Sequence, residues 1–128
     1  MLLSVRAVAL AAAAATFGPE GGAALAQNDL AAGQRLFRSQ CMGCHSVEPG
    51  RHRAGPSLHG LFGRRSGSVE GFDFSPAMTE AGIEWTPETL DAFLADPDGV
   101  VPGTRRVFWG LAPEARRQVI RYLEEATE

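Results

Sequence analysis

The feature that most constrains this chain is the five-residue motif Cys41-Met42-Gly43-Cys44-His45, which contains both cysteines of the sequence. Residues three apart share one face of a helical turn, so the two sulfurs can point toward the same group. A histidine directly after the second cysteine places an imidazole beside them. This spacing is typical of c-type haem attachment, in which both sulfurs bond the porphyrin and the histidine binds iron. The motif therefore predicts one covalent haem c held by Cys41 and Cys44, with His45 as the iron ligand.

Two other uses of the cysteines remain as alternatives. A zinc site needs a second pair of ligands, and the other two histidines, His52 and His59, do not follow the usual spacing. A redox-active dithiol is expected between a strand and a helix, and that context is missing around Cys41. Haem attachment therefore accounts for the motif better than either alternative.

The first 26 residues have the pattern of a secretory signal peptide. Arg6 supplies the positive charge, residues 7–17 form an apolar, alanine-rich run, and residues 24–26 (ALA) fit the small-residue cleavage pattern. The apolar run is short for a bilayer span, so we expect cleavage rather than a retained anchor. The expected product is residues 27–128, a single haem-binding domain in the periplasm without a membrane span.

The remaining chain is predicted to be all-α. Asp29 is the expected N-cap of a first helix that reaches residue 40, and Ser75-Pro76 and Thr86-Pro87 begin two further helices. These two are expected to end at Gly82 and at residues 96–97. A last helix opens at Pro113, with an apolar stripe formed by Ala115, Val119, Tyr122 and Leu123. Residues 46–75 and 98–110 are predicted to be long loops, and no segment alternates strongly enough to be a strand.

The charge balance excludes one class of partner. The chain has 12 basic residues, all arginine, against 15 acidic residues, which gives a formal net charge of -3. Nucleic-acid binding needs a basic stripe that this composition does not indicate. We therefore expect no nucleic-acid partner.

From about residue 29 to residue 128 the sequence resembles the class I cytochromes c, close to the mitochondrial and small bacterial periplasmic members. Besides the cysteine motif, the resemblance rests on Gly33 with Phe37, on residues 55–64 (GPSLHGLFGR), on residues 82–85 (GIEW) and on residues 102–104 (PGT). It implies the cytochrome c fold, with four to five short helices and long loops wrapped round one haem. It also implies that Gly33 and Phe37 pack against the last helix, at Tyr122.

The resemblance further implies roles around the haem. The carbonyl of Pro56 would accept the free N–H of the histidine ligand, which fixes the ring and makes it more basic. Arg64, Trp85 and Thr104 would help to hold the haem propionates, although Trp85 could simply be core and Arg64 a solvated charge. His52 and His59 would lie on the same side of the ring as the histidine ligand, and neither is expected to bind iron.

The sequence departs from this family at the second axial ligand. Where the family has a methionine two residues after the threonine of its Pro-Gly-Thr run, this chain has Arg106. Met42 and Met78 are not expected to replace it. An arginine stays charged and is a very poor iron ligand, so Arg106 is expected at the solvent or paired with a propionate or an anion. The sixth iron position would then be open or filled by water, hydroxide or another group.

Two aromatic substitutions accompany this change. Phe93 stands where the family usually has a tyrosine that bonds the methionine sulfur, and Phe74 replaces a tyrosine that usually touches a propionate. Together they indicate an altered distal side.

Two functional hypotheses follow. The first is a monomeric, non-enzymatic electron carrier between periplasmic or membrane-bound redox proteins. The second is a haem protein with an open iron that binds small ligands such as CO or NO, or acts on peroxide. The pair Arg105-Arg106 is either a docking patch for an acidic partner or a solvated loop charge.

Overall fold

The computed structural model describes residues 20–105 and 108–128. Most of the predicted signal peptide and the Arg106 substitution therefore lie outside the described residues. The elements follow one another as α1 (Glu20–Leu36), a π-helical turn η1 (Phe37–Cys41), α2 (Pro76–Glu80), α3 (Pro87–Ala95), α4 (Pro97–Val100) and α5 (Pro113–Ala126).

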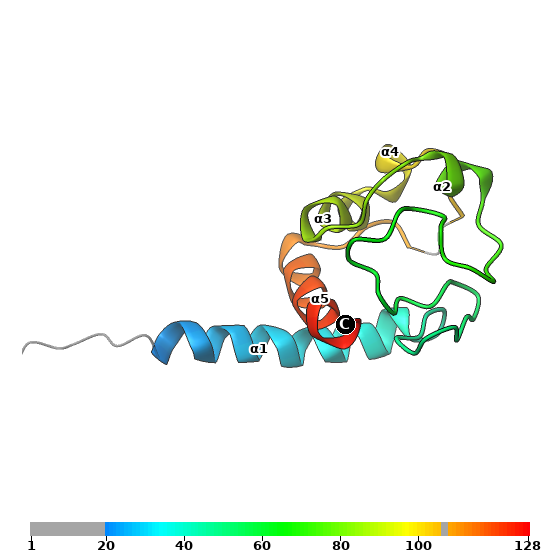
Figure 1. Ribbon diagram of the computed structural model, residues 1–128. Coiled ribbons are helices and arrows are strands. Elements are labelled where there is room, and N and C mark those ends of the chain that lie inside the picture. Colours follow the sequence, from blue (N-terminus) through cyan, green and yellow to red (C-terminus); the bar gives the residue numbers. More distant parts are fainter. Residues whose placement is uncertain (1–19, 106–107) are drawn as a thin grey trace, which may run out of the picture.

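The prediction of an all-α domain is confirmed over the described ranges. The sole β feature within those ranges is an isolated bridge between Arg65 and Glu84. Residues 46–75 carry no helix and run as one long loop along one side of the molecule, as expected (Figure 1). No helix in the described part of the chain is long and apolar enough to cross a membrane.

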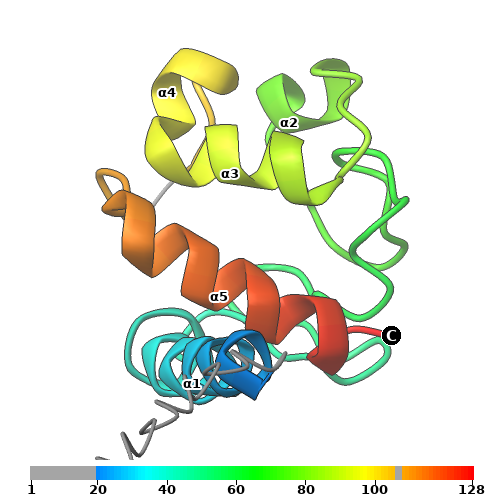
Figure 2. The same ribbon diagram turned by 90° about the vertical axis from the view of Figure 1, so that its left-hand side faces the viewer.

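The structural framework is the crossing of α1 and α5, seen with α1 end-on in Figure 2. Gly33 makes the close approach feasible, because a Cβ at this position would collide with the backbone carbonyl of Gln118 on α5. One turn later, the buried Phe37 ring meets the Tyr122 ring with centroids 5.3 Å apart. The packing of Gly33 and Phe37 against Tyr122 is therefore confirmed, and it directs the end of α1 and the cysteine motif toward the core.

The predicted start of the first helix is wrong. The helix begins at Glu20 rather than after Asp29, because residues 20–28 contain no proline and include four alanines or leucines that favour helix. Asp29 instead lies within α1, and its carboxylate accepts hydrogen bonds from the guanidinium of Arg117 on α5, the shorter at 3.0 Å. This hydrogen bond holds the pKa of the Asp29 carboxyl below its ordinary value.

The starts of α2 and α3 agree with the predicted caps. The Ser75 hydroxyl accepts a hydrogen bond from the backbone N–H of Met78, and Thr86 and Thr89 form a reciprocal capping box. α2 ends at Glu80 with Ala81 as its C-cap, and the predicted stop residue Gly82 follows in a left-handed conformation with φ +66°.

One short helix was missing from the prediction. α4 occupies the first residues of the segment that was expected to be a loop. It forms because the Asp96 carboxylate accepts a hydrogen bond of 3.0 Å from the backbone N–H of Gly99, while Pro97 occupies the first helical turn.

The hydrophobic core lies between these helices and the long loop. Its buried members come from η1, the loop, the segment before α3, α3 itself and α5: Phe37, Leu61, Trp85, Leu90, Val119, Ile120 and Leu123. Several of these side chains also face a cavity, so the core and the candidate site share their walls.

Candidate haem site

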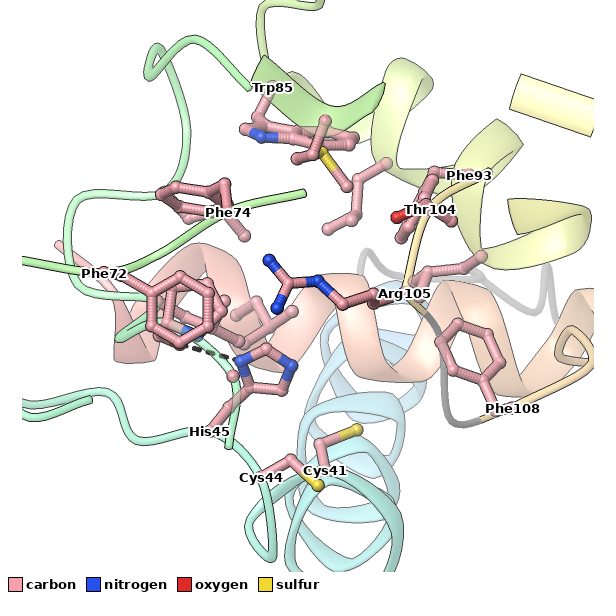
Figure 3. Close-up of a pocket in the computed structure, with 18 of the residues that line it drawn as sticks. Cys41, Cys44, His45, Phe72, Phe74, Trp85, Phe93, Thr104, Arg105 and Phe108 are labelled. Atoms are coloured by element: carbon pink, nitrogen blue, oxygen red, sulfur yellow. Dashed lines mark hydrogen bonds between the residues drawn. The ribbon is translucent and has the colours of Figure 1, made fainter. Parts of the chain in front are cut away.

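A cavity of about 270 Å³ opens between η1, the long loop, α2, α3 and α5. It contains every residue that the sequence singled out as a haem contact: Cys41, Cys44, His45, Pro56, Arg64, Trp85 and Thr104. Most of the remaining wall is aliphatic or aromatic. Figure 3 shows Cys41, Cys44 and His45 on one side of this space, and Trp85, Phe93 and Thr104 on the opposite side.

The two cysteines reach the cavity because a tight turn follows η1. The backbone N–H groups of Cys44 and His45 both donate to the carbonyl of Cys41, at 3.0 and 2.9 Å. Burial, and secondarily the neighbouring Cys44, raises the pKa of the Cys41 thiol. A thioether bond leaves its sulfur uncharged, which suits this partly buried position.

His45 is oriented by the long loop. Its Nδ1 lies 2.7 Å from the carbonyl oxygen of Pro56, and since a carbonyl only accepts, this nitrogen carries the proton. The other nitrogen, Nε2, is thereby left with a lone pair for a metal. Burial lowers the pKa of His45, an effect that the hydrogen bond to Pro56 opposes and the charge of Arg64 reinforces. The imidazole is therefore neutral at neutral pH.

The glycine before Pro56 completes this arrangement. A Cβ on Gly55 would overlap the His45 ring, so only glycine leaves room for the imidazole. The N–H of Gly55 also donates to the carbonyl of Cys44 at 2.7 Å. The loop therefore contacts the His45 ring through Pro56 and the backbone of the cysteine motif through Gly55.

Arg64 is half-buried at the cavity wall. Its guanidinium donates to the backbone carbonyls of Ser57 and His59, at 3.0 and 3.1 Å. Burial lowers the pKa of this guanidinium, which nevertheless remains protonated at neutral pH. It therefore contributes a fixed positive charge to an otherwise apolar site.

Trp85 and Thr104 lie on the side of the cavity away from the cysteines (Figure 3). Both are buried, with 7% and 9% of their surface exposed. Trp85 also packs edge-on against the Phe93 ring, with centroids 5.3 Å apart, so it belongs to the core and to the cavity wall at once. The two interpretations of Trp85 from the sequence are thus compatible.

The other two histidines lie outside the cavity lining. His52 accepts a hydrogen bond from the backbone N–H of Ser57 and contacts the carbonyl of Glu70 at 2.9 Å, so it joins two parts of the loop. His59 is exposed. Over residues 20–105 and 108–128, no group of three or more histidine, cysteine or acidic side chains is arranged to hold a metal ion.

Comparison with known proteins agrees with this geometry. The family model for cytochrome c matches residues 30–127. The chain belongs to the cytochrome c family. It is 42% identical over 100 residues to cytochrome c type-1 of Ascaris suum, an alignment that covers 77% of this chain and 89% of the relative.

Plant and algal relatives give the same result. Cytochrome c of Nigella damascena is 42% identical over 101 residues, covering 77% of this chain and 91% of the relative. Cytochrome c of Chlamydomonas reinhardtii is 46% identical over 101 residues, covering 77% and 90%.

Membership of the cytochrome c family makes this chain an electron carrier with one covalently bound haem c, and such carriers are not enzymes. The cavity fits this group, because two sulfurs and a neutral imidazole share one wall while most of the remaining lining is apolar. When bound, the haem supplies a one-electron ferrous–ferric couple. The chain would attach this group through the two sulfurs, orient His45 and surround the ring with low-polarity side chains.

Sequence reasoning missed several residues of the site. Gly55 was noted as part of a similar stretch but not as the residue that makes room for His45. Phe72 lines the cavity and packs against Phe74, with ring centroids 4.9 Å apart. Met78, which was set aside as a ligand, also lines the cavity. Of these residues, Gly55 alone had a local signal, because it directly precedes Pro56.

We predict that Gly55→Ala displaces the His45 ring and breaks its hydrogen bond to Pro56. Without this bond the imidazole donates less charge to iron, so the midpoint potential should rise. Potentiometric titration of the holoprotein measures this shift, and Gly43→Ala is the matched control because its added Cβ meets no atom within 4 Å. Equal potentials for the two variants would contradict the orienting role of the loop.

Proposed function

We propose that this cytochrome c is exported to the periplasm, where residues 27–128 carry electrons between periplasmic or membrane-bound redox proteins as a monomer. The proposal is supported by the signal-like pattern of residues 1–26 and by the family match, which starts at residue 30. Within this proposal, Cys41 and Cys44 attach the haem and His45 binds its iron. The observation that carries these roles is the 2.7 Å contact between His45 and Pro56, which leaves Nε2 facing a cavity shared with both sulfurs.

The remaining roles concern the haem propionates. Arg64 supplies a half-buried positive charge, and Trp85 and Thr104 supply an indole N–H and a hydroxyl in the same cavity. Such groups can satisfy carboxylates that enter a largely apolar site. We assign all three to propionate binding.

Export can be tested by fractionating cells that express the full chain. We predict that the haem-containing protein is found in the periplasmic fraction and that its N-terminal residue is Gln27. N-terminal sequencing or intact mass measurement gives the answer. Retention of residues 1–26 in a membrane fraction would contradict cleavage, whereas a haem-free product in the cytoplasm would contradict export itself.

The sixth iron position is proposed to lack a methionine, since Arg106 occupies the place at which the family has its axial methionine. A harder oxygen ligand such as water or hydroxide favours ferric iron and lowers the potential relative to methionine. Electron transfer remains feasible with such a ligand, because a lower potential increases the driving force for donation to an acceptor and decreases only the driving force for reduction by a donor.

We predict that Arg106→Met raises the midpoint potential and slows the reaction of the ferrous protein with carbon monoxide. The new thioether would fill the sixth position and favour the ferrous state. Redox titration and stopped-flow visible spectra measure both effects. Arg105→Met is the control, because it adds the same side chain one residue away. An unchanged potential and carbon monoxide rate in Arg106→Met would show that another strong ligand already fills this position.

The open-iron hypothesis remains the second candidate. The observation in its favour is the apolar wall that Phe93, Leu94 and Phe108 form around the cavity. An apolar pocket suits small neutral gases better than charged ligands. Rapid binding of carbon monoxide to the unmodified ferrous protein would favour this candidate, and a low-spin spectrum that carbon monoxide leaves unchanged would remove it.

A further inference from the structure

The charged side chains of the haem cavity are both cationic. Within the described part of the chain, the cavity lining contains Arg64 and Arg105 but no aspartate or glutamate. A haem brings two propionate carboxylates into this space, and burying a carboxylate is costly unless it is paired and hydrogen-bonded. The number and the sign of the lining charges therefore match those of the two propionates. Arg64 accounts for one carboxylate, which leaves Arg105 and the other.

Arg105 reaches the cavity from the segment that follows Thr104. Figure 3 shows its side chain extending from the chain beside Thr104 into the space among the labelled residues. One guanidinium nitrogen, Nη2, donates to the backbone carbonyl of Asp73 at 2.8 Å. Asp73 directly precedes Phe74, which lines the cavity. This hydrogen bond joins residues 32 apart in sequence and holds the charge of Arg105 beside the wall that Phe74 forms.

The charge of Arg105 is not neutralised by a close acid among the described residues. Its ion pair there is with the Asp73 carboxylate, one oxygen of which lies 4.0 Å from Nη2. The Asp73 side chain is 99% exposed, so water screens this pair and its contribution is small. A guanidinium has five N–H donors in a fixed geometry that suits two parallel hydrogen bonds to one carboxylate. Arg105 therefore keeps both charge and donors for a further carboxylate.

We propose that Arg105 binds one haem propionate and Arg64 the other, so that each carboxylate has its own guanidinium. The inference rests on the propionate site proposed above and deepens it by adding Arg105 as a binding residue. This role differs from the docking patch and the solvated charge considered from the sequence. The side chains of Phe72 and Phe74 have no hydrogen-bond donor, so the guanidinium of Arg105 supplies one at this wall of the cavity.

The assignment has two physical consequences. Ferric iron carries one more positive charge than ferrous iron, so an unneutralised propionate favours the ferric state and a guanidinium beside it favours the ferrous state. Arg105 should therefore raise the midpoint potential. A nearby cation also stabilises an ionised carboxylate, so Arg105 should hold the pKa of its propionate below that of an unpaired carboxyl. Loss of Arg105 would lower the potential and raise this pKa.

The test compares Arg105→Gln with the natural holoprotein. We expect Arg105→Gln to lower the midpoint potential at neutral pH and to raise the pKa of one propionate by about 1 or more. Redox titration measures the potential. Infrared spectra of protein whose haem carries carbon-13 at its carboxyl carbons measure the pKa, because the label separates the propionates from aspartate and glutamate. Arg105→Lys should fall between the two, since it keeps the charge but loses the paired hydrogen bonds.

Arg65→Gln is the matched control. Arg65 is exposed, lies outside the cavity lining and donates to the carbonyl of Gly82 at 3.5 Å, so its exchange removes the same charge away from the site. It should leave the pKa of both propionates unchanged and shift the potential less than Arg105→Gln does. On the same reasoning Arg105→Met lowers the potential whereas Arg106→Met raises it, so these two variants shift it in opposite directions.

The outcomes separate this inference from the site on which it rests. Equal potentials for Arg105→Gln and Arg65→Gln, with the pKa of both propionates as in the natural protein, would overturn the role of Arg105. Arg64→Gln, or Arg64→Lys if the first fails to acquire haem, then tests the proposed site. A raised propionate pKa in that variant alone would keep the site and remove Arg105 from it. An unchanged propionate pKa in the Arg64 and Arg105 variants would overturn both.

Discussion

The hydrogen bond between His45 and the carbonyl of Pro56 is the interaction on which the site depends. It selects the tautomer that leaves Nε2 free, and it fastens the cysteine motif to a loop that has no helix to hold it in place. The bond forms only because Gly55 has no side chain to strike the ring. Further along, the same loop carries Arg64 and leads to α2. A single contact between residues eleven apart in sequence therefore fixes the imidazole of His45 and one wall of the cavity.

The second constraint is the close crossing of α1 and α5 at Gly33. It lets Phe37 meet Tyr122 and places the turn after η1 at the edge of the core. The cavity is thus built from two structurally different parts. A rigid helix pair presents the cysteines, and an irregular loop closes round the space beside them. This division explains why much of the chain can lack regular structure and still form one domain.

The sequence predicted features that depend on local chemistry and on the cysteine motif. The caps at Ser75 and Thr86 were predictable because each is a side chain that bonds a backbone N–H three residues away. The start of α1 was not predictable in this way. Asp29 is a residue type that often caps helices, but here its carboxylate accepts a hydrogen bond from Arg117, 88 residues away in sequence. α4 escaped detection because a helix of four residues has no periodicity to recognise.

The role of Gly55 also required the structure. It depends on which segments of the folded chain meet, and it does not follow from the spacing of residues. Family resemblance supplied the contact of Pro56 with His45, but the need for a glycine beside it appears only in the folded chain. The substitutions Arg106 and Phe93 are readable from the sequence alone.

The central claim is that one haem is covalently bound through Cys41 and Cys44 beside His45. The most direct measurement is the intact mass of the purified protein after denaturation, followed by mass analysis of the peptide that contains the motif. We predict that the mass of one haem stays on this peptide and that neither thiol reacts with an alkylating reagent. A protein that loses its haem on denaturation, or whose two thiols are both alkylated, would contradict the account.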